Sequence, residues 1–210
     1  MTDVNIKVPG LDQLAEIAKD FLQKTILPPL EEVGLLLSDK VRFYRFKNQV
    51  EIVTKAEAYL KEKNIKTKQV SLKILAPLLE QCSLEEEDSL KEKWAALLAN
   101  TVSEGSELNS TLYSHILGQM TKSDADLFQL LYRNSTTTTT GFKVSITVKE
   151  HRTIVITELR KDIKDLDLII DNLIRLRLIK EDNPFSLDTA NVALTNLGFR
   201  FMSACTFVEI

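Results

Sequence analysis

Residues 83–100 read SLEEEDSLKEKWAALLAN, and this stretch carries the clearest helix signal of the chain. Ser83 followed by Glu86 has the spacing of a capping box, in which the hydroxyl accepts from one amide and the carboxylate from another. The acids at 85–88 suit the positive end of a helix dipole. The apolar residues that follow share one helical face: Leu90, Trp94, Leu97 and Leu98. We therefore predict a helix that begins after Ser83 and ends near Gly105.

Upstream of this stretch, apolar residues at three- and four-residue steps predict three further helices. They cover residues 11–37, about 38–63 and about 71–81. Pro28-Pro29 interrupts the first, because proline lacks the amide donor and crowds the preceding turn. Asn64 is a stop signal for the second, and Pro77 predicts a kink or a later start for the third.

The second half changes character. Two short helices are predicted at 112–120 and 123–133, with Ser123 as a cap, followed by an exposed loop at Thr136–Thr140. Alternation predicts a strand at 142–148, and 154–156 is a second short extended piece. A helix at 165–177, a hairpin of 178–180 with 191–194, and a last helix capped by Thr195 complete the outline. This order is typical of a winged-helix-like module.

The predicted fold class is mainly α, with an N-terminal helical domain followed by a small winged-helix-like α+β module. We place the helical domain at residues 1–105 and the module at 106–210. The net charge of −3 argues against a protein that coats nucleic acid. No apolar run approaches the ~18–20 residues of a membrane-spanning helix, and two cysteines without metal-type or redox-type neighbours indicate free thiols in a reducing cytoplasm.

Charge is unevenly distributed between two neighbouring segments. Residues 40–73 hold ten Lys or Arg against three Glu, whereas residues 80–92 hold six acids and one Lys. The basic segment could bind phosphates, as nucleic-acid-binding surfaces do. The simpler interpretation, which we favour, is that the two segments pair within the fold or across a dimer.

A group of polar residues on the basic segment is the candidate binding surface. Arg42, Arg45 and Gln49 share one helical face, and Asn48 and Asp39 lie beside them. Guanidinium groups offer planar donor forks suited to an anion. Alternatively, Arg42 or Arg45 bridges to the acidic start of the Trp94 helix and only fastens two helices together.

Two residues of the Trp94 helix are candidate structural anchors. A tryptophan on so apolar a helix is typically a core residue rather than a ligand platform. Asn100, near the helix end, is expected to act as a capping residue. No catalytic, metal-binding or phosphate-loop motif is found, so the sequence predicts neither an enzyme nor a cofactor.

Seven short motifs follow one another along the chain. The first five are PPLEEVG at 28–34, SDKVRFYRFKNQ at 38–49, LKILAPLLE at 72–80, SLEEED at 83–88 and WAALLAN at 94–100. The other two are HILGQMTKSDA at 115–125 and LTNLG at 194–198. Together they resemble the abortive infection alpha family, a bacterial anti-phage domain of unknown function. The resemblance implies phage defence by abortive infection and implies no known catalytic residue.

The expected function is therefore a cytoplasmic anti-phage sensor or effector that acts by binding a protein partner or a second copy of itself. One alternative is a nucleic-acid-binding regulator, although its candidate recognition helix begins with Asp165, Asp167 and Asp171. Another is a membrane-disturbing effector that uses the amphipathic segment at 11–37, although interfacial helices usually carry more Lys and Arg.

Overall fold

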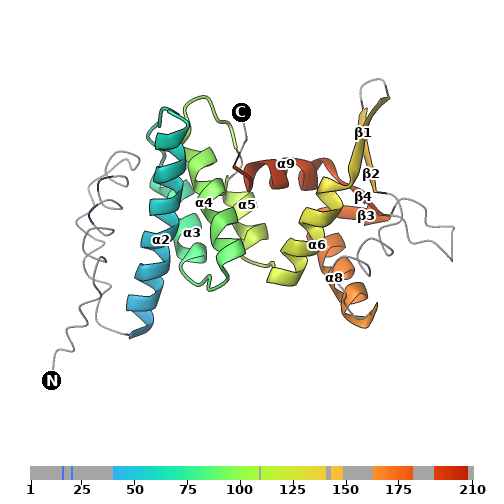
Figure 1. Ribbon diagram of the computed structural model, residues 1–210, viewed down its shortest axis with the longest axis horizontal. Helices are drawn as coiled ribbons and strands as arrows, with labels where there is room; N and C mark the ends of the chain where they lie inside the picture. The colour runs from blue at the N-terminus through green and yellow to red at the C-terminus, as the bar shows by residue number, and fades with distance from the viewer. Residues whose placement is uncertain are drawn as a thin grey trace. The chain divides into compact units, whose positions relative to one another are not determined.

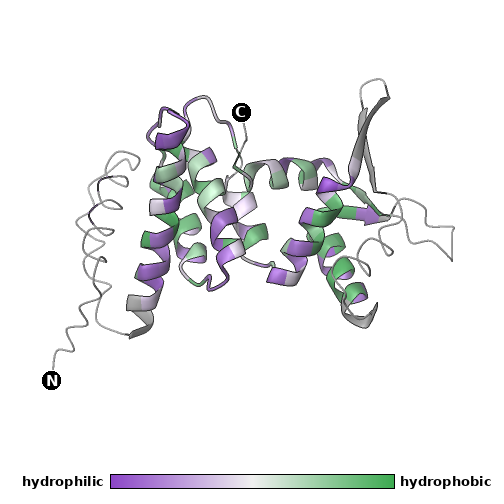
Figure 2. Ribbon diagram, in the orientation of Figure 1, coloured by the Kyte–Doolittle hydropathy of each residue, from purple (hydrophilic) through white to green (hydrophobic). Residues whose placement is uncertain are grey.

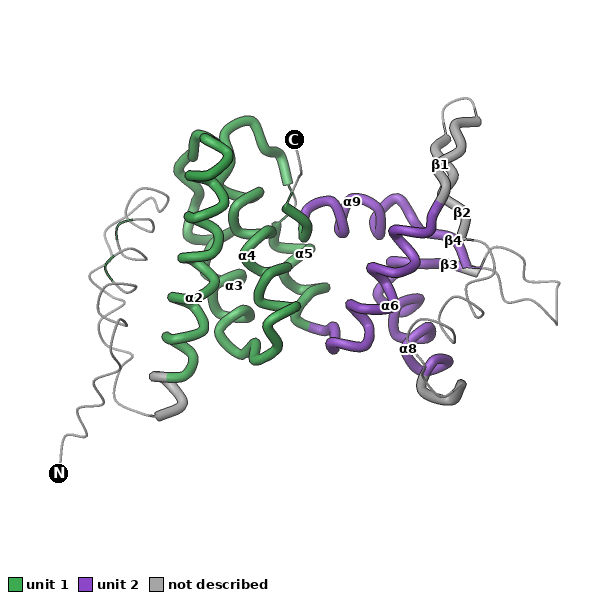
Figure 3. Tube along the Cα trace, in the orientation of Figure 1, with its two compact units in different colours: residues 1–118, 205–210 green, residues 119–204 purple. Residues whose placement is uncertain are grey.

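The computed structural model describes residues 16, 20, 40–108, 110–140, 143–148, 163–181 and 192–207. It divides the chain into two compact units (Figures 1 and 3). Unit 1 comprises residues 1–118 and 205–210, and unit 2 comprises residues 119–204. The fold is mainly helical, as predicted. Apart from Glu16 and Asp20, which are helical, the predicted helix at 11–37 lies outside the described residues.

Unit 1 is a helical bundle built around one central helix. Its helices are α2 (Lys40–Glu62), α3 (Leu72–Cys82), α4 (Asp88–Val102) and α5 (Ser110–Leu117). α4 contacts each of the other three, and α3 also packs on α5 and α2. Burial follows from this position, because residues 93–99 of α4 are all buried. The largest fully buried side chains of the unit are Trp94, Ile52, Leu75, Leu78, Leu90, Leu97, Leu98 and Leu117.

The first two described helices largely follow their predicted ranges. In α2 the apolar residues Val50, Val53 and Leu60 are buried, and Phe46 is half-buried. Asn64 ends it as expected, since its backbone adopts a left-handed φ of 51° while the amide of Ile65 donates to the carbonyl of Leu60. α3 runs through Pro77 from Leu72, so a later start is not observed.

The predicted start of the Trp94 helix is wrong. α4 begins at Asp88, and Ser83 instead ends α3, where its hydroxyl donates to the carbonyl of Glu80 at 2.5 Å. A serine hydroxyl can serve either helix end, because it can donate to a carbonyl as readily as it accepts from an amide. The same helix stops at Val102, three residues before Gly105.

Unit 2 contains three helices and a four-stranded sheet in its described parts. They are α6 (Lys122–Arg133), β1 (Ser135–Thr140), β2 (Lys143–Val148), α8 (Ile163–Arg175), β3 (Ile179–Glu181), β4 (Val192–Leu194) and α9 (Asn196–Ala204). The sheet order is β1-β2-β4-β3, with every neighbouring pair antiparallel. α8 packs on α6 and β3, and α9 on α6 and β4. The rings of Phe128 and Phe201 lie 6.1 Å apart in the core.

Two local predictions for unit 2 are wrong and one is confirmed. Residues 136–140, predicted as a loop, form most of β1, because β-branched threonine favours extended backbone. The cap of α6 is Thr121 rather than Ser123, and it forms a full capping box with Asp124. Thr195 caps α9 as predicted, since its hydroxyl accepts from the amide of Gly198 at 2.9 Å.

Three further predictions have different outcomes. The hairpin of β3 and β4 is present, whereas residues 154–156 lie outside the described part of the chain. The domain boundary at 105/106 stays a prediction; in the structure α5 contacts α3 and α4 within unit 1. Among the described residues, no helix is both long enough and apolar enough to cross a membrane.

Candidate functional site

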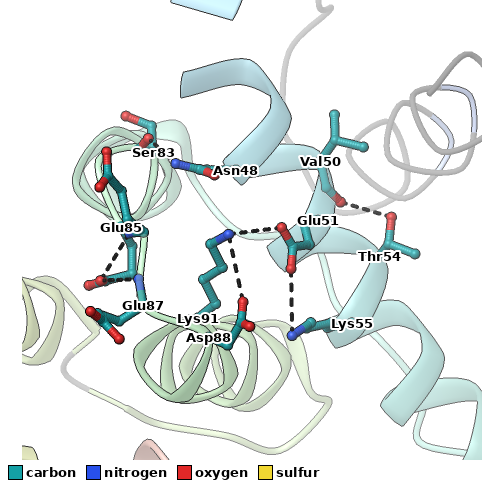
Figure 4. Close-up of polar contacts among 11 residues, drawn as sticks. Asn48, Val50, Glu51, Thr54, Lys55, Ser83, Glu85, Glu87, Asp88 and Lys91 are labelled. Atoms are coloured by element: carbon teal, nitrogen blue, oxygen red, sulfur yellow. Dashed lines mark hydrogen bonds and ion pairs between the residues drawn. The ribbon is translucent and has the colours of Figure 1, made fainter. Parts of the chain in front are cut away.

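The polar residues predicted on the basic helix face the end of α3. The Nε of Arg45 donates to the hydroxyl of Ser83 at 2.9 Å, and the Nδ2 of Asn48 donates to the Ser83 carbonyl at 3.1 Å. One turn away, the Nε2 of Gln49 donates to the carbonyl of Leu79 at 2.8 Å. These three side chains, Arg45, Asn48 and Gln49, are each half-buried. Figure 4 shows Asn48 of α2 beside Ser83.

These contacts satisfy a helix end. The last carbonyls of an α-helix have no partner within the helix, and its C-terminus carries a partial negative charge. Asn48 supplies a donor to the carbonyl of Ser83, and Gln49 adds one to the carbonyl of Leu79, which also accepts from the Sγ of Cys82 at 3.4 Å. Arg45 brings a positive charge to the same place. Asp39 lies outside the described residues, and Arg42 is in α2 but its side chain is not described. A binding role for these five residues stays a prediction.

The turn before α4 is organised by Glu85, which the sequence indicated only as one of four acids near a helix start. Its Oε1 accepts from the amides of Glu86 and Glu87, each at 3.1 Å. Its Oε2 lies 3.4 Å from the indole nitrogen of Trp94, a side chain that is 1% exposed. One carboxylate therefore fixes the turn and satisfies the buried indole donor. The doubled contact was not visible in a run of four acids.

The ion pair that joins the two charged segments has its charges the opposite way round from the prediction: the base comes from residues 80–92 and the acid from residues 40–73. Lys91, the one base counted in the acidic segment, donates to the carboxylate of Glu51 at 3.0 Å and is only 8% exposed. Lys55 lies 3.7 Å from the same carboxylate, and Asp88 lies 4.0 Å from Lys91 (Figure 4). Among the described side chains, no ion pair joins a base of 44–73 to an acid of 80–92. The exposed acids before α4 are thus left on the surface.

Asn100 holds a returning segment of chain instead of capping α4. Its Nδ2 donates to the carbonyl of Thr206 at 3.3 Å, and the cap position is taken by Ser103. Beside it, the rings of Tyr59 and Phe207 lie 4.2 Å apart. Residues 205–207, which follow unit 2 in sequence, are therefore fastened to unit 1.

Neither cysteine is suited to redox chemistry. Both thiols are free and buried. Burial raises the pKa of Cys82 well above its usual value, and the charge of Glu85 raises it further. Burial also raises the pKa of Cys205, with a smaller opposing effect of Lys93. Thiols held neutral in this way are poor nucleophiles. Within the part of the chain that the structure describes, no group of three His, Cys, Asp or Glu could hold a metal ion.

The exposed face of α8 in unit 2 is acidic and apolar. Leu166, Ile170 and Leu173 point into the core, whereas Leu168 is 70% exposed and flanked by the exposed Asp167. Figure 2 shows both hydrophobic and hydrophilic residues along this helix.

The one arginine of α8 is already bound within unit 2. Arg175 donates to the Oδ1 of Asn172 at 2.8 and 3.1 Å and to the Oε1 of Gln119 at 2.9 Å. Among the described side chains of α8, Arg175 is thus the one cation, and its guanidinium is already held by two amide side chains.

Comparison with known proteins gives one match, to a family model. A family model described as abortive infection alpha matches residues 39–205, which include most of unit 1 and all of unit 2. No curated protein and no solved structure gives a significant match.

Proposed function

Since the chain belongs to the abortive infection alpha family, we propose that it defends bacterial cells against phage as a cytoplasmic sensor or effector, and that it acts by binding a protein rather than by catalysis. The family match over residues 39–205 carries the defence role. The proposed mode of action rests on the chemistry of two surfaces, the polar face of α2 and the exposed face of α8.

The polar groups of α2 favour a structural role over a small-molecule site between α2 and the end of α3. Arg45, Asn48 and Gln49 direct their described hydrogen bonds to the end of α3. A ligand that used the same donors would have to break these bonds and leave the Ser83 carbonyl without the donor that Asn48 supplies, which costs free energy. The proposed contact with a partner therefore lies elsewhere.

The exposed face of α8 is the proposed contact surface. We propose that unit 2 is a winged-helix-like module, since β2, β4 and β3 form adjacent antiparallel strands and α8 directly precedes the β3–β4 hairpin. In a DNA-reading module of this kind, the helix before the hairpin would bring basic residues to phosphates. Here it presents Leu168 beside Asp167 and, one turn on, Asp171, a surface suited to a protein partner with apolar and basic residues.

An infection time course at high phage multiplicity tests both levels of the proposal. Leu168→Lys is compared with the matched control Leu84→Lys, because both leucines are similarly exposed, at 70% and 66%, and lie in different units. We expect cells with the intact gene to stop growing early and release few phage. The control should behave in the same way, whereas Leu168→Lys should lose protection at normal protein abundance.

The outcomes separate the two levels. If intact cells lyse as cells without the gene do, across unrelated phages, the defence role is wrong. If Leu168→Lys protects as well as the intact gene, the α8 surface is wrong while the defence role stands. Salt-sensitive binding of the purified chain to nucleic acid would favour the regulator instead. Leakage of vesicles that requires residues 11–37 would favour the membrane effector.

A further inference from the structure

The two edge strands of the unit 2 sheet differ strongly. β3 is 3 residues long and carries Lys180 and Glu181. β1, at the other edge, is 6 residues long and consists of Ser135 followed by five threonines, with no charge and no proline. Short length, charge and proline are three of the devices by which proteins keep edge strands from pairing with another chain. β3 has the first two of these devices, and β1 has none.

The backbone of β1 is regular along its whole length. Its residues pair antiparallel with six consecutive residues of β2, from Ser135 with Val148 to Thr140 with Lys143, and no bulge interrupts the register. Among the described strands, β2 is the one that pairs with β1. In an antiparallel strand, alternate residues direct their N–H and C=O groups away from the existing partner. Within the described part of the chain, the outer edge of β1 is therefore a template for one more strand.

We propose that this edge pairs antiparallel with β1 of a second copy of the chain, across a two-fold axis, so that the two sheets become one. A run of identical residues is complementary to its own antiparallel copy, and cross-strand threonine pairs are favourable. β1 carries no charge that would select an acidic or a basic peptide instead. A two-fold contact also closes after two copies and leaves no threonine edge free. The proposal goes beyond the defence role and does not depend on it.

Substitutions at the centre of β1 test the dimer in the full-length chain. The mass in solution is measured by analytical ultracentrifugation at low and high concentration for the intact chain, Thr138→Lys and Thr138→Glu. We expect the intact chain to reach the dimer mass, each variant alone to stay at the monomer mass, and an equimolar mixture of the two variants to recover the dimer through opposite charges. Thr111→Lys, at an exposed position of α5, is the matched control and should dimerise as the intact chain does.

A second measurement needs no variant. Amide hydrogen exchange of residues 135–140 should show alternate amides protected at all concentrations and the others protected only where the dimer forms. An intact chain that stays monomeric at high concentration overturns the proposal. So does a folded Thr138→Lys variant that dimerises normally, or outward amides whose exchange is independent of concentration. If the chain dimerises but gives no phage protection, the defence role is wrong and the dimer stands. If the chain protects cells but stays monomeric, the dimer is wrong and the defence role stands.

Discussion

Replacing Arg45, Asn48 and Gln49 together by alanine decides whether these residues are structural or form a binding surface. The hydrogen bonds from Asn48 and Gln49 to carbonyls of the α3 end, at 3.1 and 2.8 Å, are neutral, and each contributes about 1 kcal/mol. The bond from Arg45 to Ser83 has a charged donor and contributes about 2 kcal/mol, less some solvent screening because the side chain is half-exposed. Arg45 and Asn48 meet at Ser83, so their effects are not additive, and we expect a total loss of about 3 kcal/mol.

Urea unfolding followed by tryptophan fluorescence measures this loss in the right place. Trp94 is the one tryptophan of the chain and lies buried in α4, so its emission reports on unit 1. The triple variant should unfold at a lower urea midpoint with an unchanged slope. Lys47→Ala, at an exposed position of the same helix, should keep the midpoint of the intact chain. A triple variant with the normal midpoint that loses phage protection at normal abundance would refute the structural interpretation.

Three further changes give distinct signatures. Gly198→Ala should destabilise unit 2 by about 3 kcal/mol, because the new Cβ would lie 2.1 Å from the carbonyl oxygen of Leu178. Gly118→Ala should cost less than about 1 kcal/mol, because only the end of the Gln81 side chain must move. Equal shifts of the two thermal unfolding midpoints would contradict this. Thr121→Val should cost about 1 kcal/mol by removing the α6 capping box, while Thr121→Ser should keep it, as thermal unfolding can show. Burial raises the pKa of both thiols, so the folded chain retains protons that the unfolded chain releases above about pH 8.5. The stability they contribute is fully present below that pH and falls by up to about 1.4 kcal/mol per pH unit per thiol above it; Cys205→Ala should make the measured slope less steep, and an unchanged slope would contradict the assignment.

Helical periodicity predicted most of the elements because burial in this fold is one-sided or complete along whole helices. α2 shows its stripe of Val50, Val53 and Leu60, and α8 shows Leu166, Ile170 and Leu173. Helix ends were less predictable because a hydroxyl near a boundary suits two roles. Ser83 ends α3, and there its hydroxyl accepts from Arg45, which lies 38 residues upstream and meets it only in the folded chain.

Only one side of the contact between α2 and the end of α3 was visible in the sequence. The donors on α2 were visible in the sequence as Arg, Asn and Gln on a shared face. Their acceptors are a hydroxyl and two main-chain carbonyls, and every residue has a carbonyl, so no pattern could point to Leu79 or Ser83. The threonine run was misjudged for a related reason, because its low complexity suggested a loop while its β-branched side chains favour a strand.

The fastening of residues 205–207 to unit 1 bears on the order in which the chain is made and folds. Asn100 and Tyr59 are synthesised early, but their partners Thr206 and Phe207 leave the ribosome only after all of unit 2 has been translated. Domains that are continuous in sequence can fold as they emerge. Here the contacts of Asn100 with Thr206 and of Tyr59 with Phe207 can form only at the end of synthesis, so the helical unit completes its packing after all of unit 2 has been translated.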